Sequence, residues 1–190
     1  MKKISILLVA TVVALSSFKA VEMWKMDKAH SALTFTVTHM GISDAVGTFK
    51  NVDVTIKSEK ADFSDAIFEF TAEAASVNTG NEMRDKHLMS PEFFDVEKFP
   101  KVSFVSTGIK NVSKNTYKLS GNLTLHGVTK PVVLDMLYRG TIENPMSKAT
   151  TSGFQVTGSI KRSDFAFGSG MPEALLSDVV TIKADGEFTK

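Results

Sequence analysis

This chain of 190 residues has few side chains whose types and spacing indicate catalysis or metal binding. Its histidines, His30, His39, His87 and His126, stand far apart, and none belongs to a short metal-ligand pair or a His-Glu-x-x-His motif. The chain has no cysteine, which excludes disulfides, thiolate metal sites and cysteine nucleophiles. We therefore expect no metal site and no cofactor.

Nucleophilic and acid–base motifs are equally sparse. Gly168-Ser169-Gly170 lacks the spacing of a nucleophile elbow and the strand–turn–helix context that such an elbow needs, so it reads as a flexible loop. Asp85 and His87 could form an acid–base pair, although adjacent positions do not establish its geometry. Catalysis therefore stays an alternative without a clear motif.

Charged and imidazole side chains could instead hold the polar end of a ligand through charge-assisted hydrogen bonds. The same side chains could also be structural, because Arg84 with Asp85 and Arg162 with Asp164 could fix loops as ion pairs or caps. The candidates for contact with a ligand head group are His39, Arg84, Asp85, His87, Arg162 and Asp164.

The composition indicates one folded domain. Hydrophobic residues make up 43% of the chain, which is enough for a sizeable core at this length. The formal net charge is +1 and no block of like charges occurs, so a nucleic-acid-binding surface is not expected.

Residues 1–20 have the pattern of a signal peptide. Lys2 and Lys3 precede an apolar run over 4–15, which is shorter than the roughly 20 residues of a membrane-spanning helix. Cleavage is expected after Ser16 or Ala20, and a retained anchor is the alternative. The pattern predicts export, a mature domain over residues 21–190 and no stable membrane span after cleavage.

Most of the mature chain alternates between apolar and polar residues with the period of a half-buried strand. The phase changes between Phe49 and Val52, which suggests a bulge or a bend there. The predicted fold is an all-β, eight-stranded antiparallel barrel. It is preferred over a sandwich because the strands are long, mostly joined in sequence, and lose their free edges on closure. The expected strand segments are 24–27, 32–39, 46–57, 66–77, 102–107, 117–125, 130–139, 151–162 and 179–188.

The stretch 81–104 interrupts this alternation with a short helical insert. Helix formers occupy 82–89, and Ser90-Pro91 could begin a second short helix. Phe93 and Phe94 are adjacent, so their rings must point in different directions. We expect a lid or plug over the barrel, with these rings lining its channel and Arg84 and His87 near its polar end; ordinary core packing of the rings is the alternative.

The sequence resembles the YceI-like family over essentially the whole mature chain. The resemblance implies an extended lipocalin-like barrel, secreted to the periplasm in many members, with an apolar channel that holds a polyisoprenoid lipid. The matching residues, in order, are Trp24, Asp27, His30-Ser31, Phe35, His39, Gly47-x-Phe49, Arg84-Asp85, His87-Leu88, Phe93-Phe94-Asp95, Phe99-Pro100, Phe104, Gly121-x-Leu123-Thr124, His126-Gly127-Val128-Thr129-x-Pro131-Val132, Arg162-x-Asp164-Phe165, Ser177-Asp178 and Val180.

Phenylalanine supplies 14 residues of the chain, against one tryptophan and two tyrosines. Phe and Met side chains have no hydrogen-bonding group to satisfy and suit the wall of a channel for a hydrocarbon tail, although any one of them could simply pack in a core. The candidates for the channel lining are Phe35, Val37, Phe49, Phe68, Phe70, Phe93, Phe94, Phe104, Leu119, Leu123, Met136, Phe154 and Phe165.

The sequence thus favours a periplasmic or secreted protein, without catalytic activity, that stores or transports an amphipathic isoprenoid lipid of the prenyl quinone or prenyl phosphate type. An enzyme acting on such a lipid, with His39, Asp85 and His87 at the channel mouth, is one alternative. A structural or stress-response adhesin with an interior filled by side chains is another. Whether the chain is a monomer or a homodimer stays open.

Overall fold

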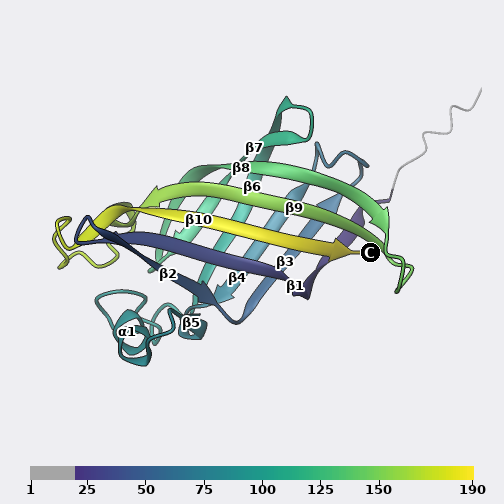
Figure 1. Ribbon diagram of the computed structural model, residues 1–190. Helices are drawn as coiled ribbons and strands as arrows, with labels where there is room; N and C mark the ends of the chain where they lie inside the picture. The colour runs from purple at the N-terminus through teal and green to yellow at the C-terminus, as the bar shows by residue number, and fades with distance from the viewer. Residues whose placement is uncertain (1–19) are drawn as a thin grey trace, which may run out of the picture.

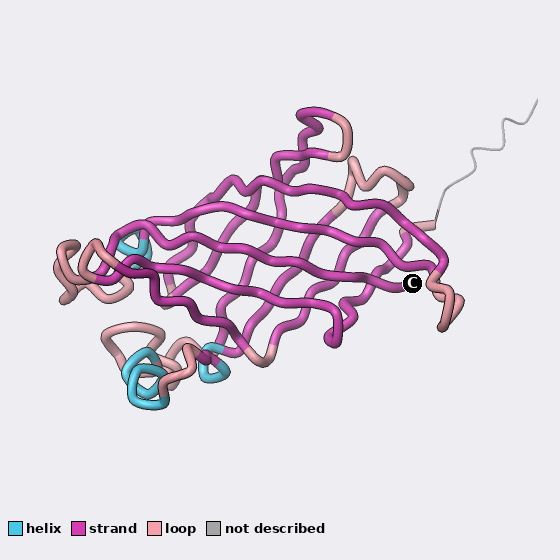
Figure 2. The backbone as a smooth tube through the Cα atoms, viewed as in Figure 1, coloured by secondary structure: helices cyan, strands magenta, loops and turns pink. Residues whose placement is uncertain are grey.

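The computed structural model describes residues 20–190, so all but the last residue of the predicted signal peptide lies outside the described residues. Within that range the chain forms one antiparallel sheet, the α-helix α1 (Glu82–Leu88) and two short 3₁₀ helices, η1 (Ala74–Ser76) and η2 (Arg162–Phe165) (Figures 1 and 2). The strands are β1 (Glu22–His39), β2 (Ser43–Phe49), β3 (Val52–Ser58), β4 (Ile67–Glu73), β5 (Val77–Asn78), β6 (Lys101–Ser113), β7 (Thr116–Leu125), β8 (Val128–Glu143), β9 (Thr150–Lys161) and β10 (Leu176–Thr189).

Eight of the strands close into a barrel. They follow the order β10-β9-β8-β7-β6-β4-β3-β1, and β1 pairs back with β10. The predicted eight-stranded antiparallel barrel is therefore confirmed, and the sandwich is wrong. The two remaining strands are additions: β2 pairs with the second half of β1, whose first residues pair with β3, and β5 pairs with β2.

Two predicted strand boundaries need correction. The segments 24–27 and 32–39 belong to the single strand β1, which has a register shift between Asp27 and Ala32 opposite β10. The segment 46–57 is split, because the chain bends at Lys50 and Asn51 between β2 and β3. This bend lies where the alternation changes phase.

The predicted helix over 82–89 is confirmed as α1, but the second helix after Ser90 is wrong. Turns occupy this stretch instead. The Ser90 carbonyl accepts hydrogen bonds from the N–H groups of both Phe93 and Asp95, and Asp95 has a φ of 46°. A left-handed residue at that position ends any helical path, so the chain reverses there.

One end of the barrel is plugged by an aromatic residue that lies between two of the expected strand segments, 46–57 and 66–77. Phe63, between β3 and β4, is 1% exposed and its ring centroid lies 5.3 Å from that of Trp24 and 4.9 Å from that of Phe154. Tyr117 donates a hydrogen bond to the Asp62 carbonyl next to it, at 2.8 Å. The connection therefore folds inward as part of the core.

The opposite end carries the connection from η2 to β10, and Arg162 holds it in place. This side chain is 5% exposed, and its guanidinium donates to backbone carbonyls along the connection. These are the carbonyls of Phe167 (3.3 Å), Gly168 (2.6 Å), Met171 (2.7 Å), Leu176 (3.0 Å) and Ser177 (3.2 Å). One buried cation thus satisfies a whole set of carbonyls that a loop without regular structure would leave unpaired.

The turn between β7 and β8 depends on Gly127, whose φ is +74°. A Cβ at this position would also overlap the ring of Phe99. Gly41, in the turn between β1 and β2, has a similar φ of +70° but open space around it. We expect Gly41→Ala to cost about 1–2 kcal/mol of unfolding free energy for the backbone alone, and Gly127→Ala about 1–3 kcal/mol more for the overlap. Urea unfolding of both variants measures the difference, and equal losses would contradict the packing role of Gly127.

Asp178 gives the connection after η2 a pH dependence. The backbone N–H of Ser163 donates to its carboxylate at 2.9 Å, which holds the pKa of Asp178 below its ordinary value of 3.8. A carboxylate with a depressed pKa contributes stability above its ordinary pKa and loses it as the pH falls through the lowered value. Asp178→Asn should therefore lower the thermal midpoint near neutral pH, and its difference from the wild type should shrink below about pH 3.8. Asp164→Asn, a neighbouring exposed carboxylate, is the control; a difference that stays constant into acid would contradict this role.

Candidate functional site

A cavity of about 860 Å³ occupies the barrel interior. Its wall is mainly apolar, because the strands turn their alternate apolar residues inward. The β1 residues Leu33, Phe35 and Val37 lie on one side and are paired with Ala184, Ile182 and Val180 of β10, which also line the cavity. The volume falls within the range of roughly 300–1,000 Å³ that small-molecule sites usually have. An apolar hollow of this kind excludes the reading in which side chains fill the interior.

Most of the predicted lining candidates lie on the cavity wall. They come from β1, β2, β4, β6, β7 and β9 and from the insert after α1. These wall residues are Phe35, Val37, Phe49, Phe68, Phe70, Phe93, Phe94, Phe104, Leu119, Leu123 and Phe154.

Met136 and Phe165 lie elsewhere. Both are fully buried in the packed core and are not part of the wall. Phe165 ends the 3₁₀ helix η2, and the next residue, Ala166, has a φ of 51°. This reversal leaves Phe165 in the core and puts Phe167 on the cavity wall. An alternating pattern could not reveal it, because the change of direction comes from one left-handed residue.

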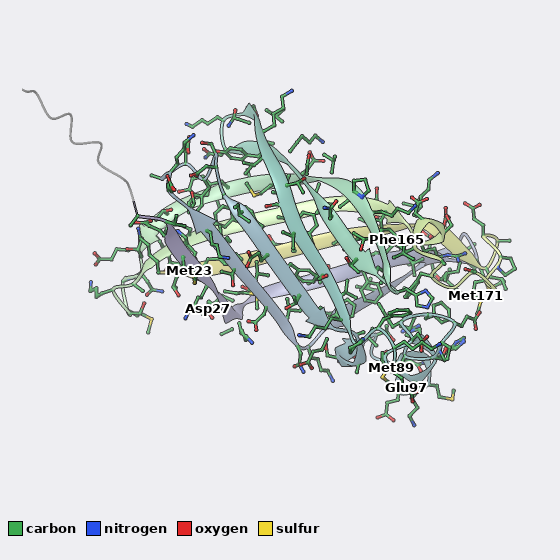
Figure 3. All side chains as sticks on the ribbon, turned by 180° about the vertical axis from the view of Figure 1, so that it is seen from behind. Met23, Asp27, Met89, Glu97, Phe165 and Met171 are labelled. Carbon is green, nitrogen blue, oxygen red and sulfur yellow. The ribbon has the colours of Figure 1, made fainter. Side chains whose placement is uncertain are left out.

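The insert covers the cavity at the end that carries the η2–β10 connection. Figure 3 shows the stretch with Met89 and Glu97 against the same end as Phe165 and Met171, whereas Met23 and Asp27 lie at the other end. Asn81 caps α1, with its side-chain oxygen accepting a hydrogen bond from the Arg84 N–H at 3.1 Å.

Three segments meet at this cover through aromatic rings. The ring centroid of Phe94 lies 5.5 Å from that of Phe49 in β2 and 4.7 Å from that of Phe167. The Phe93 ring lies 5.4 Å from Phe167 and 4.9 Å from the ring of His87. Phe93 and Phe94 are both buried and both on the wall. Lining and core packing, which the sequence analysis treated as alternatives, therefore coincide for these two rings.

Polar groups gather on the wall near the cover, and we call this part of the wall the mouth. Its predicted members are His39, Arg84 and His87. Arg84 donates from Nε to the Thr79 hydroxyl at 2.7 Å and from Nη2 to the Thr79 carbonyl at 2.8 Å. Nε2 of His87 lies 3.3 Å from Oε2 of Glu92. Further polar residues line this part of the wall without a motif to mark them in the sequence: Ser43, Asp44, Lys50 and Thr79. Lys28, Ser31 and Asp185 line the wall toward the opposite end.

The other three head-group candidates present no free polar group to the cavity. Asp85 accepts hydrogen bonds from the backbone N–H (2.8 Å) and the hydroxyl (2.6 Å) of Thr79, and it is not on the wall. Asp164 is exposed in η2 and is also away from the wall. Arg162 reaches the wall, but its guanidinium is occupied by the carbonyls described above.

The charged pairs suggested by the sequence are not formed. Among residues 20–190, neither Arg84 with Asp85 nor Arg162 with Asp164 makes a salt bridge. The Asp85–His87 pair of the enzyme alternative is not formed either, since Asp85 binds Thr79 and His87 contacts Glu92. Residues close in sequence on one helix thus find partners elsewhere.

One group of potential metal ligands lies at the end opposite the mouth. Ligand atoms of Asp27, His30 and Glu187 lie within 4.8 Å of one another. His30 Nδ1 donates a hydrogen bond to Asp27 Oδ2 at 2.9 Å, which raises the pKa of His30 and lowers that of Asp27. His30 is exposed, and such groups are common on protein surfaces without a metal, so the cluster by itself does not indicate a site.

No helix of residues 20–190 has the length and apolar character that a membrane crossing needs.

Comparison with known proteins agrees with the barrel fold. A UPF0312 protein of Staphylococcus aureus strain MSSA476 is 36% identical over 162 residues, which cover 85% of this chain and 91% of that protein. The crystal structure of a Campylobacter jejuni YCEI protein superposes with a TM-score of 0.74 at 31% identity, over 80% of this chain and 89% of that one. A structure described as a polyisoprenoid binding domain from Saccharophagus degradans shares the fold, with a TM-score of 0.67 at 15% identity over 90% of this chain and 99% of that one.

The family model described as the YceI-like domain matches residues 24–188, which is nearly the whole described chain. This match and the relatives at more than 30% identity establish the relationship that the sequence motifs predicted. The chain belongs to the YceI-like family.

Proposed function

We propose that this protein holds an amphipathic isoprenoid lipid, of the prenyl quinone or prenyl phosphate type, in the barrel cavity and stores or transports it in the periplasm or outside the cell. The observation that carries the proposal is the cavity of about 860 Å³ with an apolar wall and a polar mouth. A mainly apolar wall with polar groups at the mouth fits a ligand with a long hydrocarbon tail and a polar end.

Burial of the tail accounts for affinity. Each buried CH₂ group contributes about 0.8 kcal/mol, so a tail of about 20 carbons gains on the order of 15 kcal/mol before the costs of association and ordering. The rings of Phe35, Phe70 and Phe104 on the wall present no polar group to this tail. A barrel lined in this way needs no specific tail contact to bind tightly.

The mouth supports the orientation of the ligand. His39, Arg84 and His87 place imidazole and guanidinium donors where a phosphate or quinone oxygen would emerge from the barrel. Lys50 adds a further cation to the same region. The head group would thus face the insert, and the tail would extend toward the Phe63 plug.

The Saccharophagus degradans domain supports the ligand class, since its description names polyisoprenoid binding and it has the same fold. The predicted signal peptide supports the location. Binding without catalysis is preferred over an enzyme, because the Asp85 carboxylate of the acid–base alternative is bound to Thr79.

Filling the cavity should remove the ligand. Ala184 lies on the wall in β10, so the ring in Ala184→Phe would occupy space that a tail needs. We expect undecaprenyl phosphate and ubiquinone to be taken up from detergent by the wild type, and about tenfold less well by Ala184→Phe, because the ring removes several buried CH₂ contacts. Native mass spectrometry measures occupancy. Thr181→Phe, on the exposed face of the same strand, is the control. If the purified wild type contains no lipid and takes up neither undecaprenyl phosphate nor ubiquinone, the proposed function is wrong.

The aromatic rings of the cover should affect both the thermal stability of the protein and the retention of its ligand. Phe94 is on the wall, whereas Phe165 is equally buried but away from it. Phe94→Leu and Phe165→Leu should each lower the thermal midpoint of the lipid-free protein, because each disturbs a packed core. Only Phe94→Leu should speed the loss of bound ubiquinone. Unchanged retention in Phe94→Leu would mean that this ring only supports the core.

A further inference from the structure

The turn between β1 and β2 exposes large apolar side chains at the mouth end of the barrel. Met40 is 52% exposed and Ile42 is 82% exposed. The N–H of Met40 donates to the carbonyl of Leu175 at 2.9 Å, which places the turn beside the η2–β10 connection, where Leu175 is itself 45% exposed. Apolar side chains from two separate segments thus form one projection.

Local folding does not account for these side chains. Met40 and Gly41, the central residues of the turn, have φ values of 53° and 70°. Turns with two positive φ values favour Asn followed by Gly, and a bulky side chain at the first position is unfavourable there. Met40 therefore costs backbone energy while half of its surface stays exposed, and Ile42 beside it buries still less. A contact outside the folded chain would explain its presence.

The projection is continuous with the cavity. Val46 is 51% exposed and also lies on the cavity wall, and Leu175 combines the same two properties. The projection therefore borders the cavity through Val46 and Leu175. We call Met40, Ile42, Val46 and Leu175 the apolar rim.

The ends of the described chain lie away from the rim. In Figure 1 the β1–β2 turn and the η2–β10 connection are at one end of the barrel, and the C-terminus is at the other. Nζ of Lys190 lies 2.5 Å from Oε2 of Glu22, so the first strand begins at that far end too. Neither end of residues 20–190 obstructs an approach to the rim.

We propose that the apolar rim inserts into the surface of a lipid bilayer, so that a lipid passes between the bilayer and the cavity without crossing water. The inference rests on the proposed function in that the cavity takes a lipid. The rim is small beside the roughly 20–30 residues that each partner supplies to a stable protein interface, which favours a bilayer as occupant over a protein. The charged residues two positions from rim residues in the sequence, Asp44 and Glu173, are exposed and acidic. Apolar insertion therefore provides the attraction, and binding needs no anionic lipid.

Co-sedimentation with phosphatidylcholine vesicles tests the proposal on the full mature protein. The double variant Met40→Asn, Ile42→Thr should bind these vesicles about tenfold less tightly, since insertion scales with the apolar area buried. Its thermal midpoint should stay or rise, because Asn suits the turn. Neither residue is on the cavity wall, so uptake of ubiquinone from detergent should not change.

Met146→Asn is the matched control, because Met146 is 93% exposed in the β8–β9 turn, near Lys190 at the far end. Three outcomes would contradict the insertion of the rim into a bilayer. The wild type could stay in the supernatant, Met146→Asn could lower vesicle binding as much as the double variant does, or binding could appear only with added phosphatidylglycerol and disappear in salt. The two proposals can also be separated. If the wild type binds vesicles but takes up neither ubiquinone nor undecaprenyl phosphate from detergent, insertion of the rim is supported and the proposed function is contradicted.

Discussion

Pairing between β1 and β10 is the contact on which the hollow barrel depends. It joins the first and last strands of the described chain, from Lys25 opposite Thr189 to His39 opposite Leu176. Without it the sheet would have two long free edges. Closure also fixes which side chains face inward: Leu33, Phe35 and Val37 point into the cavity only because β10 holds β1 in this register. The ligand cavity is thus a direct consequence of sheet closure.

A closed barrel still has two ends, and the chain treats them differently. At one end Phe63 packs against Trp24 and Phe154, and the plug is short and belongs to a single connection. At the other end the cover is built from separate segments, with Phe94 between Phe49 and Phe167. The cover is therefore held by contacts between separate segments, including the hydrogen bond from the Gly168 N–H to the Glu92 carbonyl at 2.9 Å, whereas the plug is part of one connection. This asymmetry gives the barrel one mouth.

Much of this arrangement could be predicted from the sequence, because strand alternation and closure are properties of pattern. The inward positions of Phe35, Phe68 and Leu119 follow from a period of two. Two of the errors occurred where a single backbone angle decides the direction. Phe63 has a φ of 57° and Ala166 a φ of 51°, and each turns an apolar residue to a place that alternation does not give. The hydrogen-bond partners of the polar residues could not be predicted from the sequence either. Asp85 accepts from Thr79, and Arg162 donates to carbonyls on a distant part of its loop.

The two halves of the mouth differ in how firmly they are held. The η2–β10 connection is fixed by the buried Arg162, and removal of a buried charged donor leaves several carbonyls without partners, so this half is rigid. The insert is held to the connection by a backbone hydrogen bond from the Gly168 N–H to the Glu92 carbonyl at 2.9 Å and by its aromatic rings, while Asp85 and Arg84 bind Thr79 just before α1. Aromatic contacts are less directional than hydrogen bonds to a buried cation and are regained after a small displacement. If the cavity opens to admit the proposed lipid, we therefore expect the insert to move, while the connection, with Leu175 beside the β1–β2 turn, keeps its place. Such an opening beside a fixed apolar rim would suit the proposed transfer of a lipid between a bilayer and the cavity.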